Sequence, residues 1–393
     1  MANTRVDVYI DAKDLEETST SPFVALALWD IYRCVRRNLF AVAAQRAHAL
    51  RVEPMSVMQH IRLLYILALT TMQFPPNPPD EEERQEVASE AKRLEEADGY
   101  VAEARTLAYD IGELAVYAQL TYLHAKIQHG RQCFGAALVY YKITLQAFVA
   151  QVEGLEQERI LQLDTLDALA VESFLMGRYS HADQYLTATR RLLLPDEDNQ
   201  QRIANLEWTQ MLLERWRERP LEALRHGDYA LTAYSTRDDP LSLARLSIVI
   251  ADMYLDLALP LDGQRATPQR DWALSQATPH LARALQTANE HIDPAGYGLM
   301  LLAQSRFLQT SGFDAAALHT LTSVESTARQ LKDWPLLAQT QMTRGAVVTA
   351  QGDADAARDW YRATLVTLGR SEAAAYAMWA LKALDQGDAN DGM

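Results

Sequence analysis

The stretch Arg344–Leu365, RGAVVTAQGDADAARDWYRATL, decides the fold. Gly352 stands between two runs with helical apolar spacing, and Ala357 and Tyr361 follow it by five and nine residues. A glycine at this place lets the chain reverse between two antiparallel helices. The small residue allows the helices to approach closely, and the large one fills the groove between them. The stretch therefore predicts a helical hairpin.

The same order of a glycine, a small residue and a large residue recurs earlier in the chain. The sets are Gly130/Gly135/Val139, Gly177/Ala182/Leu186 and Gly312/Ala317/Leu321. Two less regular copies lie between the second and third sets, and one of them is centred on Ala223. A single hairpin leaves one face unburied, so successive hairpins must stack. We therefore expect an all-α protein, an α-solenoid of stacked antiparallel helical hairpins.

These hairpins resemble the tetratricopeptide repeat family. In that family a small residue on the first helix of each unit faces an alanine-containing motif on the second. The best copies, each with the residue in the small first-helix place, are Arg344–Leu365 with Gly345, Leu166–Ala188 with Ala170, and Leu301–Leu321 with Ser305. The resemblance covers roughly residues 105–370. Units near 40 residues, as between Gly312 and Gly352, exceed the usual period of about 34 and resemble the long-helix units of bacterial sensor and peptide-responsive regulators.

Irregular segments divide the chain. The proline-rich segment FPPNPPD, Phe74–Asp80, cannot be helical and predicts the end of an N-terminal helical subdomain, residues 1–80. Residues 81–386 would form the TPR-like solenoid, with a loop insertion at 259–267 and a capping helix at its end. Residues 387–393 are expected to be a flexible tail.

Composition excludes several classes of function. The chain has 37 Lys and Arg residues against 52 Asp and Glu, and a net charge of −15 argues against nucleic acid as a partner. Its start lacks a secretory pattern, and the apolar run Leu63–Met72 is too short to span a bilayer, so we expect a cytoplasmic protein. Neither metal-ligand spacing nor a phosphate-binding or nucleophile motif occurs, which predicts no metal, no cofactor and no enzymatic activity.

The resemblance implies where a ligand would bind. In tetratricopeptide-like arrays the first helix of each hairpin lines the concave face, which gives as candidates Tyr117, His124, Asp167, Phe174, Asn205, Trp208, Arg215, Arg245, Asp252, Arg306, Gln309 and Gln339. The three arginines and two aromatic residues of this set suit a peptide that carries a carboxylate. In the alternative interpretation the arginines pair with Asp164, Asp167 and Asp252, and the aromatic residues belong to the core.

The N-terminal stretch Ala47–Ile61, AHALRVEPMSVMQHI, has the order of a helix-turn-helix unit. Arg51 stands where such turns favour glycine, and the second helix continues into a very apolar sequence. The stretch therefore indicates either a buried helical hairpin or a DNA-reading element. Base contacts would come from Ser56, Gln59, His60 and Arg62.

The sequence predicts a non-catalytic scaffold or adaptor that binds a protein or peptide along its concave face. The alternative is a peptide- or ligand-responsive transcriptional regulator that uses the helix-turn-helix-like stretch. Homodimerisation through the N-terminal helices stays open, because they carry more apolar residues than one face needs: Phe23, Leu26, Trp29, Ile31 and Tyr32.

Overall fold

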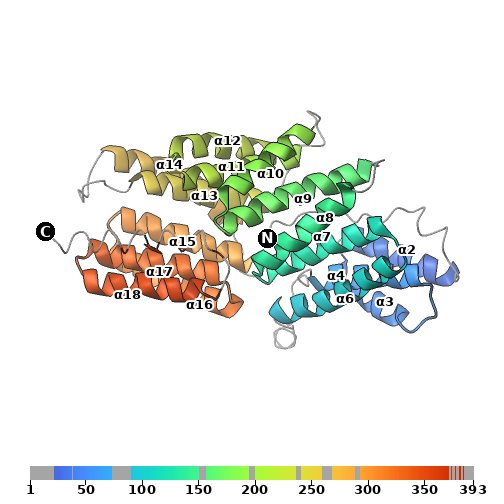
Figure 1. Ribbon diagram of the computed structural model, residues 1–393. Helices are drawn as coiled ribbons and strands as arrows, with labels where there is room; N and C mark the ends of the chain where they lie inside the picture. The colour runs from blue at the N-terminus through green and yellow to red at the C-terminus, as the bar shows by residue number, and fades with distance from the viewer. Residues whose placement is uncertain are drawn as a thin grey trace. The chain divides into compact units, whose positions relative to one another are not determined.

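A computed structural model describes residues 22–37, 39–72, 90–149, 156–193, 200–235, 240–258, 268–287 and 293–370, with isolated residues between 373 and 384. Within these ranges the secondary structure is α-helical and contains no strand (Figure 1). The chain divides into two compact units, with the boundary in the sequence between Glu172 and Ser173. The expected boundary at residue 80, the insertion at 259–267 and the tail at 387–393 lie outside the described residues.

The first unit contains three N-terminal helices followed by further antiparallel helices. They are α2 (Pro22–Arg36), α3 (Phe40–Leu50), α4 (Val57–Met72), α6 (Glu90–Asp110), α7 (Leu114–Gly130), α8 (Phe134–Val149) and most of α9 (Glu156–Leu175). Helix α4 packs on α2, α3 and α6, and α7 packs on α6 and α8. One continuous apolar core runs from Val24 on α2 to Ile127 on α7. The N-terminal helices therefore share their core with the helices that follow.

The second unit is a series of antiparallel hairpins. It contains α10 (Tyr179–Leu192), α11 (Gln200–Trp216), α12 (Pro220–Ser235), α13 (Pro240–Ala258), α14 (Pro268–Thr287), α15 (Pro294–Thr310), α16 (Asp314–Leu331), α17 (Trp334–Ala350) and α18 (Ala354–Leu368). Helices α11 and α12, α13 and α14, α15 and α16, and α17 and α18 pair as hairpins (Figure 1). Each hairpin also packs on the next, which confirms the predicted stacking.

Small residues allow close contact inside the hairpins, as the sequence predicted. A Cβ atom on Gly345 of α17 would lie 2.5 Å from the ring of Tyr361 on α18, so only glycine fits beneath this ring. In the preceding hairpin, buried Ser305 donates a hydrogen bond to the carbonyl oxygen of Ala317 at 3.1 Å. In both hairpins the small residue of the first helix contacts a residue of the repeated pattern on the second helix, Tyr361 in one and Ala317 in the other.

Seven turns among the described residues share one backbone form. In each, a residue with positive φ follows a helix, and the next N–H bonds to the carbonyl five residues back, as in a Schellman motif. Glycine fills this place at 112, 177, 312 and 352, whereas Gln132, Glu218 and Lys332 fill it elsewhere. The predicted set Gly130/Gly135/Val139 is therefore wrong by two residues. Its true counterpart is Gln132/Ala137/Tyr141, and both Ala137 and Tyr141 are buried.

The helix-turn-helix-like stretch is part of the core of the first unit. Helix α4 begins at Val57, and its residues 61–70 are all buried. Gln59 is 3% exposed and Arg62 is 9% exposed, so neither side chain is presented to a DNA groove. The packing is that of a buried helical hairpin.

Prolines and aspartates mark helix starts in the second unit. Helices α12, α13 and α15 begin at Pro220, Pro240 and Pro294. The Asp293 carboxylate accepts a hydrogen bond from Gly296 N at 3.0 Å and so caps α15.

Candidate functional site

In the second unit, the first helices of successive hairpins lie next to each other. Helix α13 packs on α15, and α15 packs on α17. We call the surface that α11, α13, α15 and α17 provide the inner face. Eight of the predicted site residues belong to these four helices: Asn205, Trp208, Arg215, Arg245, Asp252, Arg306, Gln309 and Gln339.

A cluster of two arginines and two aspartates joins three of these helices. Arg215 of α11 donates from Nε to Asp256 at 2.9 Å and from NH2 to Asp252 at 2.9 Å. Arg306 of α15 donates to Asp256 at 2.6 Å and pairs closely with Asp252. Both aspartates belong to α13, so the carboxylates of one helix hold the guanidinium groups of its two neighbours. We call these four residues the arginine–aspartate cluster.

The pairing favours the charged forms of Asp256 and Arg306. Burial alone would raise the pKa of Asp256, but Arg215 and Arg306 hold it below its ordinary value. In the same way burial would lower the pKa of Arg306, but Asp252 and Asp256 raise it. The side chains of Arg215, Asp252 and Arg306 are 14%, 19% and 19% exposed, so the cluster still reaches solvent. It offers charged donors and acceptors with a balanced total charge.

The third predicted arginine has a different partner. Arg245 donates from Nε at 2.8 Å and from NH2 at 2.6 Å to the two carboxylate oxygens of Asp293. Burial would raise the pKa of Asp293, but hydrogen bonds from Arg245 lower it. All three arginines are therefore held by carboxylates of the chain. This arrangement corresponds to the pairing alternative, with Asp252 as one of the aspartates named in advance and Asp256 and Asp293 as further partners.

The other inner-face candidates have mixed surroundings. Trp208 is half-buried and meets Tyr234 edge to face with ring centroids 6.0 Å apart, and the Tyr234 hydroxyl donates to the Asn205 side chain. Gln309 is half-buried. The Gln339 side chain donates to the carbonyl oxygen of Pro335 at 3.4 Å. Polar and aromatic groups thus line the inner face beside the cluster.

One predicted residue of the first unit, His124, belongs to a different cluster. The Asp98 carboxylate lies 2.7 Å from His124 Nε2 and accepts from Gln128 at 2.6 Å and from Arg131 at 2.7 Å. We call these four residues the histidine cluster. The His124 ring stacks on Tyr140 with centroids 4.1 Å apart. Burial lowers the pKa of His124 against the opposing effect of Asp98, so the ring is neutral at pH 7.

The remaining candidates do not join either cluster. Tyr117 pairs with Tyr109 at 5.6 Å between ring centroids. Phe174 is buried and contacts Tyr179 at 5.9 Å, which places it in the core. Asp167 is half-buried, and together with the buried Glu172 it raises the pKa of Tyr141, after the larger effect of burial.

The sequence interpretation missed Asp256, Asp98, Gln128 and Arg131. Asp256 stands one helical turn after Asp252, so its position on the same face could have revealed it. Asp98 lies in the acidic start of the region after residue 80, where solvated charge hides a specific contact. Its partners come from 26 to 33 residues later, and a single sequence does not show such pairing.

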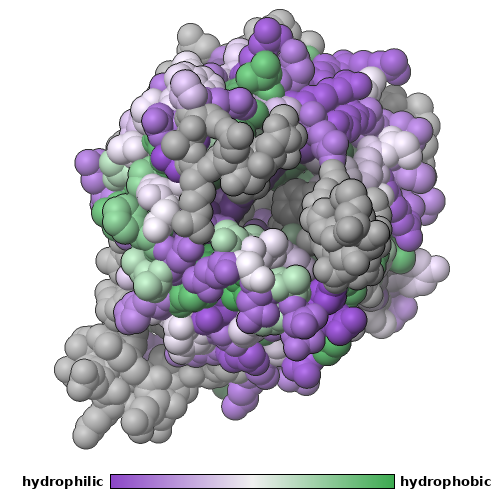
Figure 2. All heavy atoms as spheres, turned by 90° about the vertical axis from the view of Figure 1, so that its left-hand side faces the viewer, coloured by the Kyte–Doolittle hydropathy of each residue, from purple (hydrophilic) through white to green (hydrophobic). Residues whose placement is uncertain are grey.

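Some kinds of site are absent from the described residues. They contain no group of three or more His, Cys, Asp and Glu side chains arranged to hold a metal ion. None of their helices is both long enough and apolar enough to cross a bilayer. On the face shown in Figure 2, hydrophobic side chains form separate patches among polar ones.

Comparison with known proteins identifies the architecture. No protein-family model and no curated protein matches the sequence. The apo form of the quorum sensor NprR from B. thuringiensis superposes with a TM-score of 0.63 at 12% identity, over 88% of this chain and 87% of that one. The chain has the TPR-like helical-repeat fold. At 12% identity, the superposition establishes this fold and nothing further.

Two further TPR-like structures were solved with ligands. A Rap protein complexed with Competence and Sporulation Factor gives a TM-score of 0.56 at 12% identity and covers 94% of this chain and 99% of its own. The Rap conjugation gene regulator of plasmid pLS20, in complex with the Phr* peptide, gives 0.55 at 12% identity, over 90% and 97%. The predicted TPR-like solenoid is thereby confirmed.

Proposed function

We propose that this TPR-like protein is a regulator or adaptor that binds an extended peptide or protein segment along the inner face of its second unit. The arginine–aspartate cluster carries the proposal. It spans α11, α13 and α15 and sets charged donors and acceptors across three repeats, which suits the regularly spaced amide groups of an extended chain. Two similar structures, solved with Competence and Sporulation Factor and with the Phr* peptide, support the same class of ligand.

The internal pairing of the arginines changes the ligand that we expect. Arg215 and Arg306 already share two carboxylates, so a ligand carboxylate would have to compete with Asp252 and Asp256. A peptide that hydrogen-bonds to the cluster through its backbone leaves these ion pairs in place. Half-buried Trp208 would supply apolar contact for its side chains.

The helix-turn-helix alternative has less support. A DNA-reading role would require Gln59 and Arg62 at the surface, and both are buried. Regulation of a protein partner, without direct reading of DNA by α4, fits the same inner face. We therefore retain peptide or protein binding as the single proposed activity.

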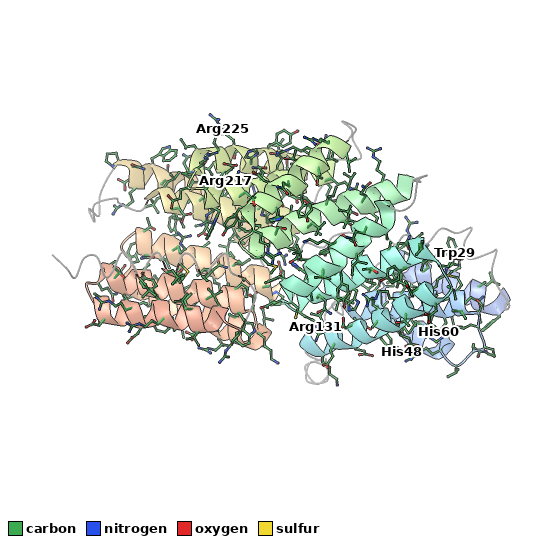
Figure 3. The ribbon with its side chains drawn as sticks, in the orientation of Figure 1. Trp29, His48, His60, Arg131, Arg217 and Arg225 are labelled. Atoms are coloured by element: carbon green, nitrogen blue, oxygen red, sulfur yellow. The ribbon has the colours of Figure 1, made fainter. Side chains whose placement is uncertain are left out.

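The proposal can be tested with peptides selected from a random display library on the full-length chain. Affinities of the selected peptides are then measured by fluorescence anisotropy for the wild type, Asp256→Asn and Gln309→Ala. Arg225→Gln serves as control, because Arg225 is exposed on α12, away from the inner face (Figure 3). We expect about tenfold weaker binding in the inner-face variants, equivalent to one or two lost hydrogen bonds, and no change in the control. Peptides that bind all variants equally would contradict the proposal.

A further inference from the structure

We propose a second binding site in the second unit, at the turn end of two neighbouring hairpins, for the C-terminal residue of a partner polypeptide. A pocket of about 580 Å³ lies there, a volume within the range of ligand sites. Its walls come from the α11–α12 turn, the end of α13 and the start of α14, and include Arg219, Pro220, Leu221, Glu222, Leu257 and Trp272. The site does not depend on binding at the inner face.

The lining predicts the apolar part of the ligand. Leu221 is 64% exposed and Trp272 is 46% exposed, although large apolar side chains are normally covered. Leu257 and Pro220 extend the same apolar surface. The two sides are held together by Gln269, which donates to the carbonyl oxygen of Leu257 at 3.2 Å. An aliphatic or aromatic side chain placed here would cover exposed carbon on all sides of the pocket.

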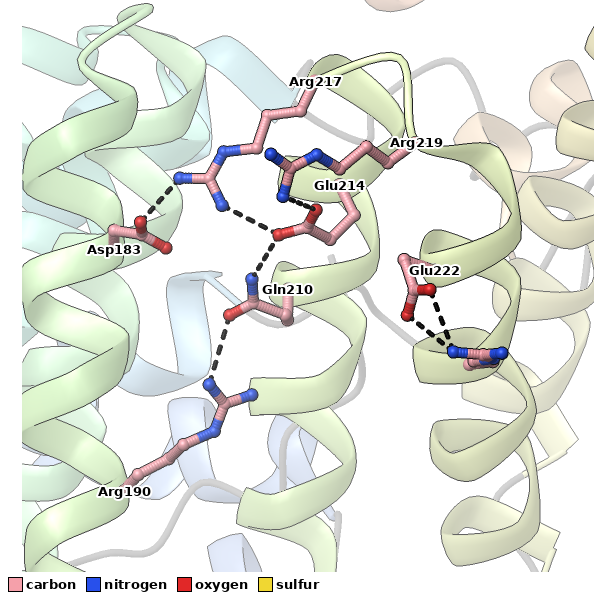
Figure 4. A network of polar contacts seen from close by, with 8 residues as sticks. Asp183, Arg190, Gln210, Glu214, Arg217, Arg219 and Glu222 are labelled. Atoms are coloured by element: carbon pink, nitrogen blue, oxygen red, sulfur yellow. Dashed lines mark hydrogen bonds and ion pairs between the residues drawn. The ribbon is translucent and has the colours of Figure 1, made fainter.

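The charges at the pocket favour a ligand carboxylate. Of the two charged lining residues, Glu222 is already neutralised by Arg225 at 2.9 Å. Arg219 has Glu214 as its carboxylate partner at 3.5 Å, and Glu214 is bound more closely by Arg217 at 2.8 Å and Gln210 at 3.0 Å (Figure 4). The Arg219 side chain is 64% exposed, so its guanidinium has N–H groups to offer an anion.

The arrangement favours a chain end over the other carriers of a carboxylate. Arg219, Pro220 and Leu221 are consecutive, so the cation directly adjoins the apolar surface. A C-terminal leucine carries its carboxylate and its apolar side chain on one residue with the same short separation. Because the apolar walls stay partly exposed, the pocket suits the end of a longer chain better than a small molecule that must be enclosed.

The test uses N-acetyl-leucyl-leucine, which ends in a free carboxylate, and its C-terminal amide. Binding to the full-length chain is followed by the indole ¹H–¹⁵N signal of Trp272, identified by its loss in Trp272→Phe. We expect the acid to shift this signal and to bind about fivefold more tightly than the amide, as one charge-assisted hydrogen bond predicts. Arg219→Gln should remove this preference, Leu221→Ser should weaken both ligands, and Asp256→Asn should change neither.

Several results would overturn the proposal. One is an unshifted Trp272 signal, and another is equal binding of acid and amide. A preference for the acid that persists in Arg219→Gln would show that Arg219 does not bind the carboxylate. If octanoate binds as tightly as the dipeptide, the site takes a small amphiphilic acid and not a chain end.

Discussion

The arginine–aspartate cluster and the histidine cluster both join helices of neighbouring hairpins, but they respond differently to the loss of a partner. In the first, two guanidinium groups share two carboxylates, and arginine cannot lose its proton in a protein. In the second, Asp98 faces a neutral imidazole, an amide and Arg131, whose side chain is 34% exposed. The comparison shows that polar contacts between neighbouring hairpins can depend on fixed charges or on groups that tolerate the loss of a partner.

The largest expected difference in stability follows from removal of one aspartate from each cluster. Asp252→Ala would leave two largely buried guanidinium groups with one carboxylate, and we expect a loss of about 3 kcal/mol in the free energy of unfolding. Asp98→Ala should cost about 1 kcal/mol, because His124 is already neutral and Arg131 can turn to solvent. Urea unfolding measures both values. Glu222→Ala, which breaks an exposed pair with Arg225, is the matched control and should cost less than about 1 kcal/mol. Equal losses at Asp252 and Asp98 would remove the distinction.

The two clusters should also differ in how their contribution to stability depends on pH. Burial lowers the pKa of His124 below 6.5, with Asp98 opposing and Arg105 and Arg131 reinforcing the shift. As the pH falls, His124 therefore takes up a proton in the unfolded chain before it does so in the folded chain. The stability that neutral His124 contributes is present above pH 6.5 and is lost as the pH falls towards the pKa of the folded state. The slope can reach about 1.4 kcal/mol per pH unit for one proton. The arginine–aspartate cluster should contribute no slope between pH 5 and 8.

The measurement compares urea midpoints from pH 8 to pH 5 in a His280→Gln background. Burial also lowers the pKa of His280 in the second unit, to about 4, so this residue would otherwise add the same sign of dependence. Adding His124→Gln should flatten the remaining dependence. An unchanged slope would show that His124 is not the group responsible.

A conservative exchange gives a smaller contrast. Arg215 binds two carboxylates through its Nε and NH2 groups, a geometry that a lysine ammonium cannot reproduce. We expect Arg215→Lys to lower the free energy of unfolding by about 1–2 kcal/mol. Arg131→Lys should cost about 0.5 kcal/mol, because Arg131 makes one contact from the surface. The reverse order would mean that charge alone, without geometry, holds the arginine–aspartate cluster.

The turns provide the smallest effect. Gln132, which directly follows Arg131, has a φ of 61°, and Lys332 in the second unit has a φ of 54°. Glycine at either place should raise the free energy of unfolding by up to about 1 kcal/mol, because it relieves the left-handed conformation. Thermal unfolding of Gln132→Gly and Lys332→Gly tests this. A gain at Lys332 alone would show that interactions of the Gln132 side chain outweigh the relief of its left-handed conformation.

Local rules account for what the sequence could predict. Glycines at 177, 312 and 352 and the helix-starting prolines act on their own neighbours, so the hairpins of the second unit were predictable. The same rule failed at Gly130, because Gln132 adopts the left-handed form without being glycine. Among the carboxylates that hold Arg215, Arg245 and Arg306, the sequence indicated Asp252 but neither Asp256 nor Asp293. Arg215 and Asp256 lie 41 residues apart, and pairing over such a distance depends on how repeats pack.

The N-terminal helices show a second limit. Ile31 and Tyr32, which were expected to help form a dimer surface, are buried in the core of the first unit. Phe23, Leu26 and Trp29 of the same helix are exposed. Helical spacing alone predicted an excess of apolar residues on α2, but it did not say which of its faces the rest of the chain would cover. Homodimerisation stays a prediction for the three exposed residues.

Asp293 connects the start of helix α15 to the preceding hairpin. Its carboxylate caps the first turn of α15 and also receives both arms of Arg245 from α13. A Cβ atom on Gly296 would collide with this carboxylate, so the turn is shaped around it. The nucleation of one hairpin is thus favoured by the presence of the preceding hairpin. In a repeat array, such coupling spreads cooperativity along the chain and disfavours states in which a single repeat frays alone.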